Sequence, residues 1–180
     1  LQPHRGVSLR ELVGGGDPVL TADPDRTGGT QLSALADLTA AELAESGTST
    51  VELVVDDGMF TGPAVSPNWR SYYVPSGVVG PVSALALDGG RISPGRSERA
   101  DDPAIAAATT FVDMLARRGI VVRAGPGRDD APANAAEVAA VRSVPLERIV
   151  EHMLLVSDND AAEVLARHVA AGTGRPASFN

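Results

Sequence analysis

The sequence contains no cysteine and no lysine among its 180 residues. Without cysteine, the chain can form neither disulfide bonds nor cysteine-based zinc sites. All 15 basic residues are arginine, whose guanidinium stays charged at physiological pH. A mechanism that needs a lysine of lowered pKa as its base therefore cannot be completed by this chain alone.

Aromatic residues and long apolar runs are also scarce. Aromatic residues make up 3% of the chain and apolar residues 43%, so the core must consist mainly of alanine, valine and leucine. The most apolar stretches are short and interrupted by glycine or proline, and we expect no transmembrane segment. The net charge of −8 argues against nucleic acid and anionic membranes as partners.

Signals for metals and cofactors are weak. The histidines His4, His152 and His168 are far apart and show no ligand spacing, so we expect structural or surface roles for them. The glycines at 14–16 lack both the Gly-Lys-Ser/Thr of a phosphate loop and the spacing of a dinucleotide fingerprint. We therefore expect no cofactor, and a turn at 14–18.

The first third of the chain alternates between strand and helix patterns. Val7–Val13 predicts a strand, and Thr30–Ser46 predicts a helix that Thr30 caps and Gly47 ends. The β-branched run Thr50–Val55 is typical of a buried strand. This order predicts a parallel βαβ unit and hence an α/β fold class.

The later elements are predicted in the same way. The pair Asp102-Pro103 is typical of a helix start, and Gly119 of its end. The buried face of this helix is expected to carry Ile105, Ala108, Val112 and Leu115. The other expected elements are strands at 82–87, 120–123 and 137–142, an exposed loop at 91–101, a turn region at 125–134, and helices at 145–155 and from 160 to about 172.

The segment 59–82 is long and rich in glycine and proline. It holds most of the aromatic residues of the chain, namely Phe60, Trp69, Tyr72 and Tyr73. A loop of this length without its own periodicity is often functional or an interaction surface. Alternatively, its aromatic side chains cover the end of the sheet, and the sequence leaves both interpretations open.

Two carboxylates, Asp56 and Asp57, directly follow the second predicted strand. Paired carboxylates could bind a divalent metal or perform acid/base chemistry. They could instead cap the turn before Gly58, and we favour this cap because no third oxygen ligand is evident.

The triplet Ser157-Asp158-Asn159 lies between two predicted helices. Residues two apart in an extended or turn-like segment point the same way, so Ser157 and Asn159 could face one cleft. A hydroxyl can give or take a proton, and a carboxamide can both donate and accept hydrogen bonds. The triplet is also a natural helix N-cap and turn composition.

Taken in order, these pieces resemble one protein family. They are residues 14–20; residues 55–63 followed by Trp69 and Tyr72-Tyr73; residues 81–85; and residues 157–163. Ser-Asp-Asn is the second signature element of penicillin-binding serine acyltransferases, beside Ser-x-x-Lys and Lys-Thr-Gly. Together the pieces resemble the class C low-molecular-mass penicillin-binding proteins, the D-alanyl-D-alanine carboxypeptidase/endopeptidases of the bacterial cell envelope. The arginine and alanine bias resembles an actinobacterial member.

The resemblance implies a division into domains. The family places a large insert between its Ser-x-x-Lys and Ser-x-Asn elements. Residues 1–142 would be the later part of a small layered α/β insert domain. Residues 143–180 would be two helices of a β-lactamase-like acyltransferase domain. We accordingly expect an internal fragment of a longer protein, with the nucleophile before Leu1 and Lys-Thr-Gly after Asn180.

The resemblance also implies serine-type hydrolysis of D-Ala-D-Ala in peptidoglycan stem peptides, inhibition by β-lactams, and a location in the cell envelope or outside the cell. Ser157 would match the serine that relays a proton near the leaving nitrogen. Asn159 would match the residue that orients the base lysine and hydrogen-bonds the substrate amide. Because the nucleophile and both lysine motifs are missing, we expect the isolated chain to be inactive.

Two other functions remain open on the sequence. The chain could be a non-catalytic envelope module that uses loop 59–82 to bind peptidoglycan or a partner. It could also be a metal-dependent α/β enzyme that uses Asp56 and Asp57.

Overall fold

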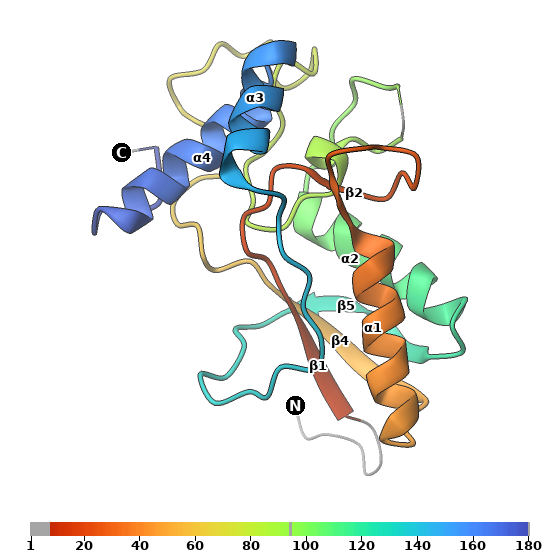
Figure 1. Cartoon of the computed structure of the whole chain (residues 1–180). Coiled ribbons are helices and arrows are strands. Elements are labelled where there is room, and N and C mark those ends of the chain that lie inside the picture. The colour runs from red at the N-terminus through yellow and green to blue at the C-terminus, as the bar shows by residue number, and fades with distance from the viewer. Residues whose placement is uncertain (1–7, 94, 180) are drawn as a thin grey trace.

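The structure is a computed structural model that describes residues 8–93 and 95–179 (Figure 1). Its main sheet has three parallel strands in the order β1-β4-β5, with β1 at Ser8–Val13, β4 at Thr50–Asp56 and β5 at Val121–Arg128. Helix α1, at Leu32–Glu45, connects β1 to β4, which confirms the predicted βαβ unit and the α/β class. Val7, the predicted start of the first strand, and His4 lie outside the described residues.

Helix α1 and helix α2, at Pro103–Ala116, pack on one face of this sheet. Side chains of β4 alternate, so that Val51, Leu53 and Val55 are buried while the residues between them are partly exposed. Leu12 of β1 lies opposite Val55 in the register and is buried with it. Burying one such side chain contributes roughly 1.5–3 kcal/mol, so apolar burial holds both helices on the sheet.

The buried face of α2 differs from the predicted one. Ala108 and Leu115 are buried as expected, whereas Ile105 and Val112 are only partly buried. The buried positions of this helix are Pro103, Ala104, Ala107, Ala108, Phe111, Met114 and Leu115. The prediction was wrong at two positions because it followed the branched aliphatic side chains, whereas the helix turns its alanines and one aromatic ring toward the core.

The helix ends were predicted with mixed success. Asp102 caps α2 by accepting a hydrogen bond from the Ile105 amide at 3.1 Å, as its position before Pro103 predicted. Thr30 does not cap α1, since Thr30 and Gln31 form the short strand β3 beside β2, at Leu20–Thr21. The Thr30 amide donates to the Val19 carbonyl in this extended stretch, and α1 begins only at Leu32.

Two predicted strands do not form. At 82–87 the backbone is held by side chains and a neighbouring loop: Ser83 accepts from the Leu85 amide, and the Ala84 carbonyl accepts from the Gly16 amide. The segment leads into a short 3-10 turn, η1, at Asp88–Gly90. Residues 137–142 also have no regular structure, although their alternating pattern is that of a strand. An alternating pattern does not supply a partner strand, which is why both predictions were wrong.

Strand β5 is longer than predicted. It continues through the Gly-Pro-Gly stretch that was expected to be a turn, and it pairs with β4 as far as Val55 and Arg128. The pairing shifts register between Glu52 and Val54, and Ala124 has a left-handed backbone with φ of 63°. This irregularity lets the strand include residues that propensity alone would assign to a turn.

The last two helices were predicted correctly. Helix α3 spans Leu146–Val156 and α4 spans Asn159–Gly172, and they pack against each other. Both lie beyond the end of β1, away from α1, together with the segment 59–82 (Figure 1). The His168 ring of α4 makes a 2.7 Å contact with the Gly16 carbonyl, which ties α4 to the loop after β1.

Candidate functional site

The Ser157-Asp158-Asn159 turn connects α3 to α4. Ser157 ends α3 with a left-handed backbone (φ 54°, ψ 50°), Asp158 is extended (φ −76°, ψ 104°), and Asn159 is the first residue of α4. A non-glycine residue with positive φ is uncommon and costs on the order of 1–2 kcal/mol. The turn therefore bends sharply at Ser157, and the common direction of the Ser157 and Asn159 side chains stays a prediction.

Each side chain of the turn has a different environment. The Asp158 carboxylate accepts a hydrogen bond from the Ala161 amide at 3.0 Å, so it is Asp158 that caps α4. The Asn159 carboxamide nitrogen donates to the Val78 carbonyl at 2.9 Å. Ser157 is exposed, and within the described part of the chain its hydroxyl has no hydrogen-bond partner. The hydroxyl is thus free to bind a ligand, while the carboxamide is held from one side.

A string of charged groups reaches the turn from α3. The His152 Nε2 atom lies 3.7 Å from an Asp158 oxygen and 3.4 Å from an Arg26 nitrogen, and Arg26 is paired with Asp88 at 3.5 Å. The Arg26 guanidinium and the Asp158 carboxylate therefore both lie beside the His152 ring. The sequence predicted a structural or surface role for His152 and did not place it beside this turn.

A buried ion pair lies directly after the turn. Arg99 Nη2 is 2.8 Å from Asp160 Oδ2, and the side chains are 2% and 15% exposed. Burial raises the pKa of Asp160, although a hydrogen bond from the Gly80 amide and the nearby Arg99 charge oppose that rise. The sequence analysis missed this pair because Arg99 was assigned to an exposed loop, which is wrong for its side chain. No local pattern marks Arg99 as different from its neighbours.

The aromatic loop packs mainly along α4. The Trp69 ring meets Phe179 edge-to-face at 5.1 Å, and Phe60 meets His168 at 5.5 Å. Tyr72 and Tyr73 contact each other, and the Tyr72 side chain is about half exposed. Phe60 and Trp69 thus bury surface against α4 and the segment that follows it, whereas Tyr72 and Tyr73 contact each other.

The paired carboxylates after β4 have structural partners. Asp56 accepts from the amides of Gly58 and Ala131, both at 2.9 Å, which confirms the favoured cap. The two Asp57 oxygens bind the Arg128 guanidinium at 2.7 and 3.1 Å. Among the described residues no group of three or more histidine or acidic side chains is arranged to hold a metal ion. The geometry therefore favours a turn braced by an ion pair.

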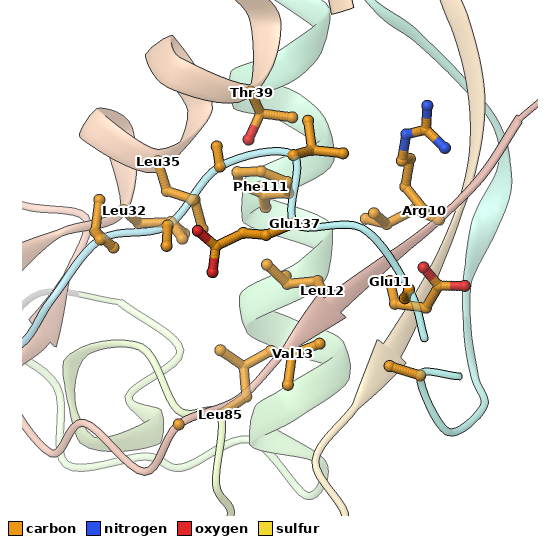
Figure 2. A pocket seen from close by; sticks show the side chains of 18 of the residues that line it. Arg10, Glu11, Leu12, Val13, Leu32, Leu35, Thr39, Leu85, Phe111 and Glu137 are labelled. Atoms are coloured by element: carbon orange, nitrogen blue, oxygen red, sulfur yellow. The ribbon is translucent and has the colours of Figure 1, made fainter. Parts of the chain in front are cut away.

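A cavity of about 740 Å³ lies elsewhere, between β1, α1 and the segment 131–143 (Figure 2). Its wall is mostly apolar and includes Leu12, Leu35 and Phe111, and Glu137 extends across it from the covering segment. Neither Ser157 nor Asn159 lines it. The cavity is the space that an unpaired segment leaves beside the sheet, and it is separate from the turn where the sequence predicts chemistry.

The fold is that of a penicillin-binding protein. The structure superposes on penicillin-binding protein 4 (dacB) of Haemophilus influenzae with a TM-score of 0.70 and 19% identity, over 99% of this chain and 52% of that one. The family model of the D-Ala-D-Ala carboxypeptidase 3 (S13) family matches residues 9–99 and 94–180. The chain therefore belongs to this family, as the order of its motifs predicted.

Two curated relatives extend this result. The chain is 34% identical over 173 residues to carboxypeptidase Rv3627c of Mycobacterium tuberculosis, which covers 94% of this chain and 36% of that protein. It is 33% identical over 175 residues to carboxypeptidase DacB of Mycolicibacterium smegmatis, covering 93% and 36%. The chain thus spans about a third of the length of these relatives. No described helix is long and apolar enough to cross a membrane.

Proposed function

We propose that this chain is part of a serine-type D-Ala-D-Ala carboxypeptidase/endopeptidase that cleaves peptidoglycan stem peptides through an acyl-enzyme. The observation that carries the proposal is the similarity, over almost the whole chain, to two relatives that are named carboxypeptidases. Membership of the S13 family supports the same reaction class. Such a protein would act in the cell envelope or outside the cell, where its substrate is, and β-lactams would inhibit it.

In this proposal Ser157 and Asn159 contribute to the reaction, although neither is the nucleophile. The exposed, unengaged Ser157 hydroxyl would relay a proton to the leaving nitrogen. Asn159 would orient the base lysine and hydrogen-bond the substrate amide. Because the chain contains no lysine, that base must come from a segment outside residues 1–180, and the isolated chain would form no adduct with a fluorescent penicillin.

The domain division is part of the proposal. Residues 1–142 would belong to the insert domain and residues 143–180 to the acyltransferase domain. Helix α3 supports this division because it buries Ile149 but leaves Leu154 and Leu155 69% and 81% exposed. An apolar helix face of this kind is typical of a surface that packs against further protein.

The test is to replace Ser157 and Asn159 by alanine in the full-length protein. We expect each variant to lose at least about a hundredfold in D-Ala release from a diacetyl-Lys-D-Ala-D-Ala peptide, the usual cost of removing a positioned proton-transfer or orienting group. Ser157→Ala should leave the melting temperature almost unchanged, because the hydroxyl makes no hydrogen bond with the described residues.

Asp158→Ala is the matched control. It removes the observed cap, so it should lower stability by about 1 kcal/mol and have the mildest effect on turnover. Full turnover in Ser157→Ala and Asn159→Ala would contradict the enzymatic proposal and favour the envelope-binding alternative, which retention of peptidoglycan by the same samples would then measure.

A further inference from the structure

We propose that Arg99 and Asp160 are positioning residues for Asn159, acting through the backbone of residues 77–80. This inference rests on the function proposed above for Asn159. It assigns to the loop between β4 and α2 a part in shaping the turn, in addition to its packing on α4.

Three backbone groups of residues 77–80 face the start of α4 and its partner Arg99. The Val78 carbonyl accepts from Asn159 Nδ2 at 2.9 Å, and the Gly80 amide donates to Asp160 Oδ1 at 2.6 Å. The Gly77 carbonyl accepts from Arg99 Nη2 at 3.1 Å, and that same nitrogen pairs with Asp160. We call this closed ring of contacts the 77–80 clamp. It fixes the loop and two adjacent α4 residues relative to each other.

Burial makes the clamp rigid. The Arg99 side chain is almost completely buried, and its Nη1 donates to the Gly89 carbonyl at 2.6 Å, so its two terminal nitrogens are held by Gly77, Gly89 and Asp160. Asp160 is held on one oxygen by the Gly80 amide and on the other by Arg99. Charge-assisted hydrogen bonds are shorter and stronger than neutral ones, and removing one partner of a buried pair leaves an uncompensated charge.

The clamp decides which way the Asn159 carboxamide faces. A carbonyl can only accept, so the Asn159 group that meets Val78 must be its NH2 and not its oxygen. The oxygen is thereby directed away from Val78, and no described residue donates to it. An oriented, unpaired carbonyl oxygen is the group that a lysine ammonium or a substrate N–H requires. If residues 77–80 shift, the carboxamide loses the contact that sets its orientation.

Independent evidence comes from Gly77. Its backbone has φ of +69°, and a Cβ at this position would clash with the Ser97 carbonyl oxygen. The loop that carries Arg99 and the loop that carries Val78 are therefore in direct backbone contact. Close backbone packing fixes the carbonyls of Gly77 and Val78 more firmly than side-chain contacts alone could.

The experiment is a double-mutant cycle in the full-length protein. Arg99→Gln should lower kcat/KM for D-Ala release by about ten- to a hundredfold, mainly through kcat, since small misplacements of a catalytic group have costs of this order. In the Asn159→Ala background the same change should cost less than about twofold, because nothing remains to be oriented. Arg99→Gln should still lower the melting temperature in both backgrounds, because its contacts with Asp160 and Gly89 do not involve Asn159. Arg96→Gln, which changes an exposed arginine in the same loop, should alter neither quantity.

Arg99→Lys keeps the positive charge but loses the planar guanidinium with its several N–H donors. This variant replaces Arg99→Gln in the experiment if Arg99→Gln does not fold. It should lower kcat/KM several-fold, again only when Asn159 is present. An equal loss of kcat/KM with and without Asn159, or no loss at all, would overturn the clamp proposal. If Asn159→Ala is itself fully active, the proposed function fails instead, so the two failures are distinguishable.

Discussion

Arg167 on α4 is a buried charged side chain whose removal should be costly. It is 3% exposed, and its guanidinium donates to the carbonyls of Thr61, Pro63 and Ala177 at 3.0, 2.8 and 3.1 Å. It also lies over the Phe179 ring, 4.5 Å from its centroid. Burial lowers the pKa of Arg167, but arginine remains charged at neutral pH. Arg167 therefore joins α4 to the start of the 59–82 loop and to the segment that follows α4.

The loss of unfolding free energy on removing Arg167 can be estimated from these contacts. A hydrogen bond from a charged donor contributes about 1.5–3 kcal/mol, and a buried acceptor left without a partner costs about 1–3 kcal/mol. Desolvation of the guanidinium offsets part of the total, and water can reach those carbonyls that are only partly buried. We expect Arg167→Ala to lower the free energy of unfolding by about 3–5 kcal/mol. Arg167→Lys should lower it by about 2 kcal/mol, since an ammonium can still satisfy one or two of the carbonyls.

The assay is urea unfolding followed by the fluorescence of Trp69, the single tryptophan, whose ring packs against Phe179. With a slope near 2 kcal/mol per molar urea, the midpoint should fall by about 2 M in Arg167→Ala. Arg148→Ala on α3 is the control, because its side chain is 68% exposed and its pair with Glu151 should contribute less than about 0.5 kcal/mol. A loss below about 1 kcal/mol in Arg167→Ala would refute the reasoning.

Two further predictions concern backbone and charge. Gly77→Ala should cost about 2–5 kcal/mol from left-handed strain plus the clash with Ser97. Gly47→Ala, with φ of +68° and open space, should cost only about 1–2 kcal/mol in the same urea assay. Burial alone would raise the pKa of Asp102, but hydrogen bonds from Arg128 and the α2 backbone lower it below its ordinary 3.8. The Asp102 charge therefore stabilises the fold at pH values above the ordinary pKa of 3.8. This stabilisation is lost as the pH falls through the lower pKa of the folded state. The gap in melting temperature between the parent and Asp102→Asn should accordingly close between about pH 5 and pH 2, and a gap constant over that range would contradict the ion pair.

The sequence predicted the elements that local physics decides. The helix from Asp102 has its cap, its proline and its stop signal within the segment itself, and the buried strand at Thr50–Asp56 has a run of β-branched residues. The last two helices were predicted equally well, because their apolar residues recur at helical spacing with polar residues between them. In each case the information lies within a few residues of the element.

The elements that failed depend on partners far away in the chain. Residues 137–142 alternate like a strand, but no strand edge receives them, and the cavity beside β1 remains between them and the core. Residues 82–87 are fixed by Ser83 and by the loop after β1 and not by a ladder. Conversely, β5 continues through glycine and proline because β4 supplies its partner. A local pattern cannot report whether a partner exists.

The candidate site divides in the same way. Its chemistry was predictable, because Ser157 and Asn159 belong to a short signature with recognisable functional groups. The residues that hold the site in place were not predictable. Val78 lies 81 residues before Asn159 in the chain and contributes a backbone carbonyl, which has no sequence signature. Arg99 resembles every other arginine of its loop until the fold buries it against Asp160.

These contacts explain how a long loop without secondary structure is ordered. Residues 59–82 are mostly exposed and form several turns of their own, and α4 adds side-chain hydrogen bonds to their backbone at two places. Near its start, Asn159 and Asp160 bind residues 78 and 80; two turns later, roughly 11–12 Å along the helix axis, Arg167 binds residues 61 and 63. The loop is therefore attached to α4 at both of its ends, and a change that moves the loop at Arg167 should also disturb the 77–80 clamp. Because the same helix begins at the Ser157-Asp158-Asn159 turn, the order of the loop and the geometry of the turn depend on one another.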